Sequence, residues 1–104
     1  MIPSSASPRV AILALLEAKP GKEIELAAFL AGALPLAEDE TQTLQWFAVR
    51  LGRSSFAIFD TFRDDAGRRA HLDGRIAAAL MQRADELLAK PPEIISGDLL
   101  AAKV

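Results

Sequence analysis

Two strand-like segments separated by three residues constrain the fold of this chain most strongly. Residues 43–51 and 55–63 are both rich in aromatic and β-branched side chains, and Gly52-Arg53-Ser54 lies between them. Two such runs joined by a short connection that contains glycine are typical of a β-hairpin. We therefore expect an antiparallel pair of strands in the middle of the chain.

The first part of the chain is expected to add one strand and one helix. Residues 9–19 are almost continuously apolar and are closed by Pro20-Gly21. A helix could be drawn over this run, but its length and the turn after it favour a strand. Residues 22–38 have apolar side chains three and four positions apart, which predicts a helix that Pro35 ends or bends. Residues 38–40, all acidic, are predicted to form a solvated loop.

The last part of the chain is expected to add a second helical region and a fourth strand. Asp64 is a suitable N-cap for a helical region over residues 64–89, with a break at Asp73-Gly74. Residues 93–103 are apolar on both faces of a strand and carry a possible bend or bulge at residues 96–98.

The resulting order, βαββαβ, predicts an α+β protein of the ferredoxin-like class with a four-stranded antiparallel sheet. With 104 residues the chain is expected to form one domain over residues 9–104, preceded by a disordered tail over residues 1–8. The tail lacks the basic and apolar regions of a signal peptide. The apolar stretch 26–37 is shorter than the roughly 20 residues that cross a bilayer, so we expect a cytoplasmic protein without a membrane partner.

Apolar residues on both faces of the strands predict a partner for the sheet. Two helices can cover only one face of a four-stranded sheet, and an antiparallel sheet with one wet face normally alternates polar and apolar residues. Residues 10–16, the hairpin and residues 94–102 do not alternate in this way. We therefore expect the second face to pack against another copy in a two-fold homodimer, the alternative being a small monomer with scattered exposed apolar residues.

Composition excludes several kinds of site. The chain has no Cys and a single His, so thiolate chemistry, disulfides and a multi-histidine metal centre within one chain are excluded, and no metal is expected. The formal net charge of -2 argues against nucleic acid as a partner, because proteins that bind phosphates usually carry a basic excess.

His71 and Asp60 are the candidates for chemistry. His71 is the one side chain whose ordinary pKa lies near neutrality, and it could be a base, a hydrogen-bond donor or a purely structural residue. Asp60 lies in the middle of a strand, where Asp is disfavoured and a buried carboxylate needs a partner. If the hairpin loop has three residues, Trp46 is expected opposite Phe62, Ala48 opposite Asp60, and Arg50 diagonal to Asp60. That register would give an aromatic pocket wall and an ion pair, or simply a structural salt bridge.

In the order and spacing of several short motifs, the chain resembles the antibiotic biosynthesis monooxygenase superfamily, whose members are dimeric α+β barrels and include quinol monooxygenase-like proteins. The motifs are residues 18–22, 46–50, 59–62, 65–68 and 70–72. The resemblance implies a subunit that dimerises through its sheet and oxygenates a small aromatic or quinol-type molecule without a cofactor. The site residues it leads us to expect are the catalytic pair His71 and Asp60 and the substrate-binding residues Trp46 and Phe62. Arg50 joins the substrate-binding residues because of its expected place beside Asp60 in the hairpin.

Two other functions remain open for the same fold. The chain has no Asn and no Tyr, residues on which oxygenases of this superfamily often rely. This favours a non-catalytic homodimer that binds a small molecule or serves a stress response. A haem-binding or haem-degrading protein is the third possibility.

Overall fold

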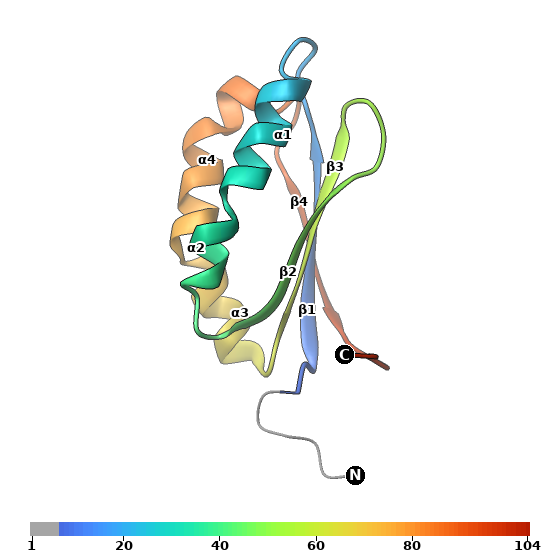
Figure 1. Cartoon of the computed structure of the whole chain (residues 1–104), viewed down its shortest axis with the longest axis vertical. Coiled ribbons are helices and arrows are strands. Elements are labelled where there is room, and N and C mark those ends of the chain that lie inside the picture. Colours follow the sequence, from blue (N-terminus) through green and yellow to red (C-terminus); the bar gives the residue numbers. More distant parts are fainter. Residues whose placement is uncertain (1–6) are drawn as a thin grey trace.

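Residues 7–104 of the chain are described in the computed structural model, so most of the tail expected over residues 1–8 lies outside the described residues. Four strands form one antiparallel sheet in the order β2-β3-β1-β4. The strands are β1 (Val10–Glu17), β2 (Thr43–Arg50), β3 (Ser55–Phe62) and β4 (Glu93–Asp98). Figure 1 shows all helices on one side of this sheet, which confirms the predicted ferredoxin-like α+β fold.

Each predicted helical region consists of two helices. The first divides into α1 (Glu23–Gly32) and α2 (Leu34–Glu38), and the second into α3 (Asp65–Leu72) and α4 (Arg75–Leu87). Pro35 lies in the first turn of α2, where its missing N–H costs no hydrogen bond, so it starts a new helix rather than ending the old one. The break at Asp73-Gly74 and the Asp64 cap were both predicted correctly, and the Asp64 carboxylate accepts a hydrogen bond from the Gly67 N–H at 2.9 Å.

The hydrophobic core lies between the helices and one face of the sheet. Because side chains alternate across a strand, Ala14 and Leu16 of β1 point to the same side as Phe56 and Ile58 of β3. These four pack with buried helix residues, namely Leu26, Leu30, Leu80 and Leu87. The core therefore fixes which face of each strand the helices cover.

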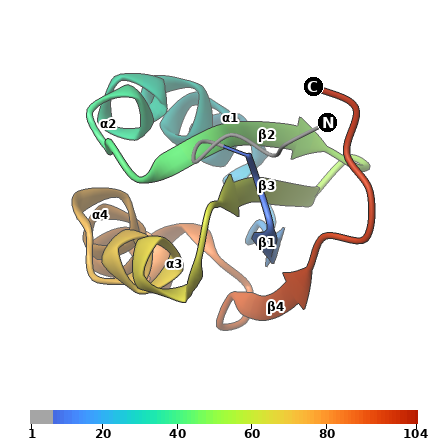
Figure 2. The same cartoon turned by 90° about the horizontal axis from the view of Figure 1, so that it is seen from below.

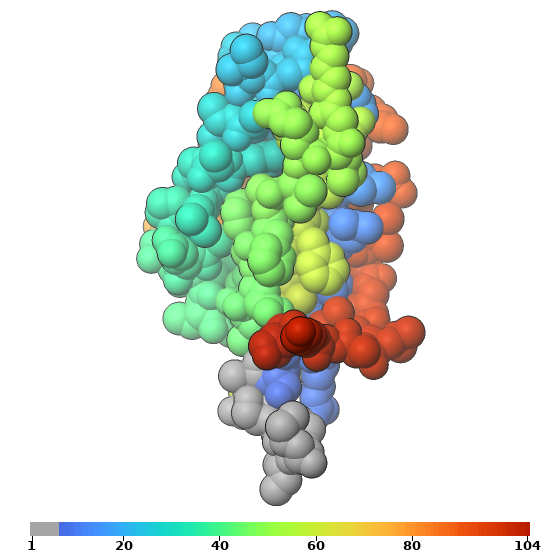
Figure 3. Space-filling model, turned by 45° about the vertical axis from the view of Figure 1, so that its right-hand side comes forward, coloured from blue at the N-terminus to red at the C-terminus, as the bar shows by residue number. Residues whose placement is uncertain are grey.

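The other face of the sheet is also apolar, as expected from the sequence. A row of side chains crosses all four strands on this face, formed by Phe47, Phe59, Leu13 and Ile95 in the order of the sheet. We call these four residues the open-face row. Phe47 is 51% exposed and Ile95 is 41% exposed. Figure 2, seen from below, shows no helix on this side, and Figure 3 shows the strands side by side there, with the chain end after β4 crossing below them.

The last strand is shorter than predicted. β4 ends at Asp98 rather than at residue 103, because Asp98 pairs with Val10, the first residue of β1, and no strand remains beyond it. The prediction of a bend or bulge at residues 96–98 is also wrong, because these residues pair with β1 without a break in register. The irregular register lies instead in β2, between Thr43 and Gln45. In residues 7–104, no helix combines the length and the apolar character that crossing a membrane requires.

Candidate functional site

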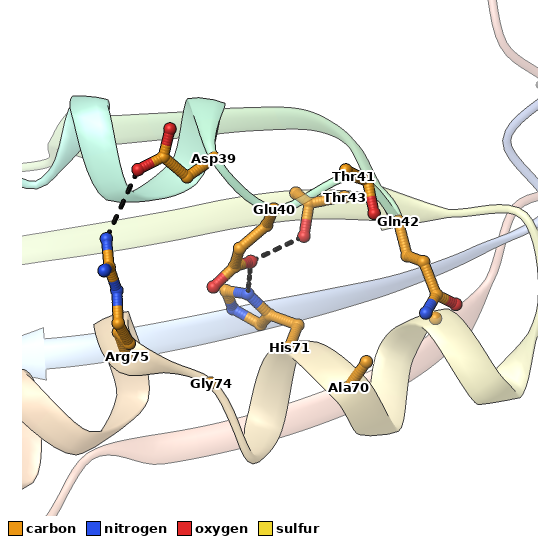
Figure 4. Close-up of a pocket in the computed structure, with 10 residues that line it drawn as sticks. Asp39, Glu40, Thr41, Gln42, Thr43, Ala70, His71, Gly74 and Arg75 are labelled. Atoms are coloured by element: carbon orange, nitrogen blue, oxygen red, sulfur yellow. Dashed lines mark hydrogen bonds and ion pairs between the residues drawn. The ribbon is translucent and has the colours of Figure 1, made fainter.

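A pocket of about 390 Å³ opens between the loop that joins α2 to β2 and the junction of α3 with α4. This volume lies within the range of about 300–1,000 Å³ that is usual for small-molecule sites. Figure 4 shows its lining, in which polar side chains predominate. The lining residues are Asp39, Glu40, Thr41, Gln42, Thr43, Gly67, Ala70, His71, Gly74 and Arg75.

His71, on the last turn of α3, is held between two carboxylates. Its Nδ1 lies 2.6 Å from Oε1 of Glu40, which also accepts a hydrogen bond from the Thr43 hydroxyl at 2.7 Å. Its Nε2 lies 2.9 Å from Oδ2 of Asp60 on β3, an ion pair whose alignment falls short of a hydrogen bond. We call Glu40, His71 and Asp60 the acid–histidine–acid cluster.

The two carboxylates determine the charge of His71. Burial alone lowers the pKa of the imidazolium, but the contacts with Asp60 and Glu40 outweigh it and raise the pKa from 6.5 to about 9. His71 is therefore protonated at neutral pH, and each of its two ring N–H groups then faces a carboxylate.

Buried polar atoms without a hydrogen-bond partner gather at this cluster. Among the described residues such side-chain atoms are Oε2 of Glu40, both carboxylate oxygens of Asp60 and Nε1 of Trp46. Trp46 pairs directly across from Asp60, and the two side chains lie on the helix-covered face of the sheet. Oδ2 of Asp60 still has its ion pair with His71. For the other atoms an unsatisfied buried polar group costs about 1–3 kcal/mol, so such a concentration calls for an explanation and is typical of a site that binds or reacts.

The structure brings only some of the predicted site residues together. The ring of Phe62 lies 5.3 Å from that of His71, centroid to centroid, and at 42° to it. The predicted hairpin register is wrong, because Trp46 rather than Ala48 pairs with Asp60. Arg50 pairs with Phe56 and stacks over its ring at 5.0 Å, so it forms no ion pair with Asp60. It borders a separate pocket of about 200 Å³ between α1 and β2.

Glu40 is the residue of this cluster that the sequence interpretation missed. It was assigned to a solvated acidic loop, and its neighbours Glu38 and Asp39 are indeed exposed. The Glu40 side chain, however, is only 18% exposed and points back toward α3. The sequence carries one signal for this, Thr43, whose hydroxyl three positions later holds the Glu40 carboxylate.

Glycines at two positions allow the loop to approach α3 and α4 closely. A Cβ at Gly67 would lie 3.3 Å from the backbone oxygen of Gln42. A Cβ at Gly74 would lie 2.9 Å from Oε2 of Glu40. Within residues 7–104 no set of three or more acidic or histidine side chains is arranged to share a metal ion. In the acid–histidine–acid cluster, the carboxylates of Glu40 and Asp60 each face one nitrogen of the His71 ring and do not converge on a common point.

Comparison with solved structures defines the class of fold. A protein from Nitrosomonas europaea that is provisionally assigned to the antibiotic biosynthesis monooxygenases superposes with a TM-score of 0.79 at 10% identity, over 88% of this chain and 99% of that one. A protein from Mycobacterium tuberculosis gives a TM-score of 0.80 at 16% identity, over 92% and 99% of the two chains. The fold is therefore that of the antibiotic biosynthesis monooxygenases, as the sequence resemblance implied.

A second protein from Nitrosomonas europaea, NE2512, of unknown function, is much more similar. It shares 56% identity over 93% of this chain and 94% of its own, with a TM-score of 0.92. The chain belongs to the same protein family as NE2512. No protein-family model and no curated protein matches the chain.

Proposed function

We propose that the protein is a cofactor-independent monooxygenase that acts on a small hydroxylated aromatic or quinol-type molecule. The observation that carries this proposal is the acid–histidine–acid cluster beside a pocket, in the fold of the antibiotic biosynthesis monooxygenases. Oxygenation without a cofactor requires an electron-rich substrate that reacts with oxygen after it has lost a proton. The protein then supplies a proton acceptor, orientation and a site shielded from water.

The chemistry assigned to this site begins with loss of a proton from the substrate at the cluster. For a methylene flanked by two aromatic rings, reaction with O₂ leaves one oxygen atom as a ketone and the other as water, so no external reductant is needed. Asp60 orients His71 from the interior, and Phe62 supports the imidazole ring. Trp46 pairs with Asp60 across the strands, and its indole N–H has no hydrogen-bond partner.

Several polar side chains border the pocket, and they favour a hydroxylated ligand over a plain hydrocarbon. Thr41, Gln42 and Arg75 border the same space as Glu40 and His71, so hydroxyl or carbonyl oxygens at both ends of a ring can find partners. Arg50 lies away from this pocket, and its predicted role in substrate binding is not part of the proposal.

We also propose that the protein acts as a homodimer in which the open-face row packs against its counterpart. Phe47 and Ile95 would otherwise leave a contiguous apolar surface in water, and the row runs across the whole sheet. A two-fold axis through this face brings the open-face row of one subunit against the same row of the other, which removes both rows from solvent.

Oxygen consumption tests the proposed activity. Purified protein in metal-free buffer is mixed with a panel of hydroquinones and anthrones, and uptake is compared with the autoxidation blank. We expect uptake from the wild type and a loss of about 100-fold or more in His71→Ala. The matched control is Arg69→Ala, on the same helix and 78% exposed. Equal uptake by wild type and His71→Ala would show that the cluster takes no part.

A further inference from the structure

The acid–histidine–acid cluster leaves His71 without a free site for a proton. Nδ1 lies 2.6 Å from Glu40 and Nε2 lies 2.9 Å from Asp60, so each ring nitrogen of the protonated ring already faces a carboxylate. A ring nitrogen can accept a substrate proton only through a free lone pair, which an imidazolium does not have. In this geometry His71 is a cation that neighbouring groups hold in place.

Of the two carboxylates, only Glu40 borders the pocket. Asp60 is 1% exposed and lies behind His71 on β3, whereas Glu40 is among the lining residues. Its Oε1 is engaged by Thr43 and His71, but its Oε2 has no hydrogen-bond partner. Because the last torsion of a Glu side chain is soft, a modest rotation presents this unpaired oxygen to a ligand in the pocket.

We propose that Glu40 is the catalytic residue that accepts the substrate proton, with His71 and Asp60 as the positioning residues behind it. This inference rests on the proposed function, whose site it deepens. His71 holds the Glu40 carboxylate in place through its Nδ1 and contributes a positive charge that stabilises the anion formed on the substrate. Asp60 keeps that charge in place from the interior.

The other charged groups around the pocket do not compete with His71 for the Glu40 carboxylate. Arg75, at the start of α4, lines the pocket but lies 3.3 Å from the Asp39 carboxylate. Both members of that pair are mostly exposed, at 70% and 74%, so solvent screens them. The nearest strong partner of Glu40 is therefore His71, in direct contact with it.

The step assigned to Glu40 is a single proton transfer. A C–H or O–H bond of the substrate breaks, its electron pair stays on the substrate as a carbanion, enolate or phenolate, and the proton forms an O–H bond with Glu40. The step needs neither oxygen nor a reductant. It can therefore be measured separately from the oxygenation.

Anaerobic exchange of hydrogen for deuterium tests this step. Wild-type protein in D₂O is incubated with anthrone without oxygen, and loss of the methylene proton signal is followed by NMR against a protein-free blank. We expect Glu40→Gln to lose about 100-fold or more of the catalysed exchange. The control is Glu38→Gln, an exposed acid two positions earlier that does not line the pocket. Glu40→Asp, which keeps a shortened carboxylate, should retain part of the exchange if the carboxylate is the acceptor.

The pH dependence separates Glu40 from His71 as the acceptor. If His71 accepted the proton, exchange by the wild type would rise as the pH passes about 9, and Glu40→Gln would move that rise to lower pH. We expect no such rise and a loss of exchange in Glu40→Gln at every pH. Undiminished exchange in Glu40→Gln, or none in the wild type, overturns the inference. Exchange that depends on Glu40 without any oxygen uptake would uphold it and reject the oxygenase.

Discussion

The backbone at Gly74 passes directly over the carboxylate of Glu40. A Cβ at this position would lie 2.9 Å from Oε2 and 3.2 Å from the carbonyl oxygens of both Ala70 and His71. The absence of a side chain at residue 74 therefore lets the junction between α3 and α4 lie close over this half-buried acid.

This contact predicts that Gly74→Ala displaces Glu40 from His71. With one carboxylate moved away, the pKa of His71 should fall from about 9 toward 6.5, because burial is then opposed by Asp60 alone. The imidazole signals of the single histidine, followed by NMR as a function of pH, measure this directly. Gly32→Ala is the control, since nothing lies within 4 Å of a Cβ there. An unchanged His71 pKa in Gly74→Ala would contradict this account.

The raised pKa of His71 also predicts how stability depends on pH. Because the folded protein binds this proton more tightly than the unfolded chain, the stabilisation is complete below about pH 6.5 and is lost as the pH rises to about 9. The shift corresponds to a loss of roughly 3 kcal/mol in the free energy of unfolding. Urea unfolding across this range should show the loss in the wild type and a flatter profile in His71→Gln. Parallel profiles for the two proteins would assign the pH dependence to other groups.

Truncating two apolar residues of the same helix should destabilise the protein by very different amounts, because only one of them lies in the core. Leu26 is fully buried, whereas Ile24, two positions earlier in α1, is 85% exposed. Leu26→Ala should lower the free energy of unfolding by about 2–5 kcal/mol through lost burial and the cavity it leaves. Ile24→Ala should change it by less than about 0.5 kcal/mol, since it touches little. Chemical denaturation of both variants provides the comparison, and similar losses would mean that the packing of α1 is misassigned.

The proposed homodimer predicts a monomeric variant. Phe47→Glu places a charge in the open-face row, where packing against a second copy would bury it unpaired. Sedimentation should then report a monomer where the wild type is dimeric. Leu34→Glu, at an exposed apolar position of α2 on the helical side, should leave the dimer intact. A dimer in Phe47→Glu, or a wild type that is monomeric at high concentration, would contradict the proposal.

The fold could be predicted from the sequence because its local signals agree with one another. The hairpin, the Asp64 cap and the break at Asp73-Gly74 each depend on neighbouring residues, and each was correct. The end of β4 could not be predicted in this way. It is set by where β1 begins, a relationship between distant segments that periodicity does not contain.

The site was only partly predictable, because its geometry also depends on contacts between segments that are distant in the sequence. His71 and Asp60 stood out by residue type and position, and they are in contact. The partner of Asp60 was misassigned even though the loop has the expected three residues, because a loop over residues 52–54 pairs Arg50 with Phe56 and therefore Trp46 with Asp60. Glu40 looked like a surface acid, since its burial requires α3 to pack against a loop more than two dozen residues before it.

The pairing of Trp46 with Asp60 has a practical consequence for studying this protein. Trp46 is the one tryptophan, and the chain contains no tyrosine, so the ultraviolet emission of the protein comes almost entirely from the residue that pairs with Asp60 across the sheet. Its unpaired N–H makes that indole sensitive to any group that comes to occupy the space next to it. The arrival of a ligand or a change of charge at the site should therefore be visible in unlabelled protein, as a shift or quenching of its own fluorescence.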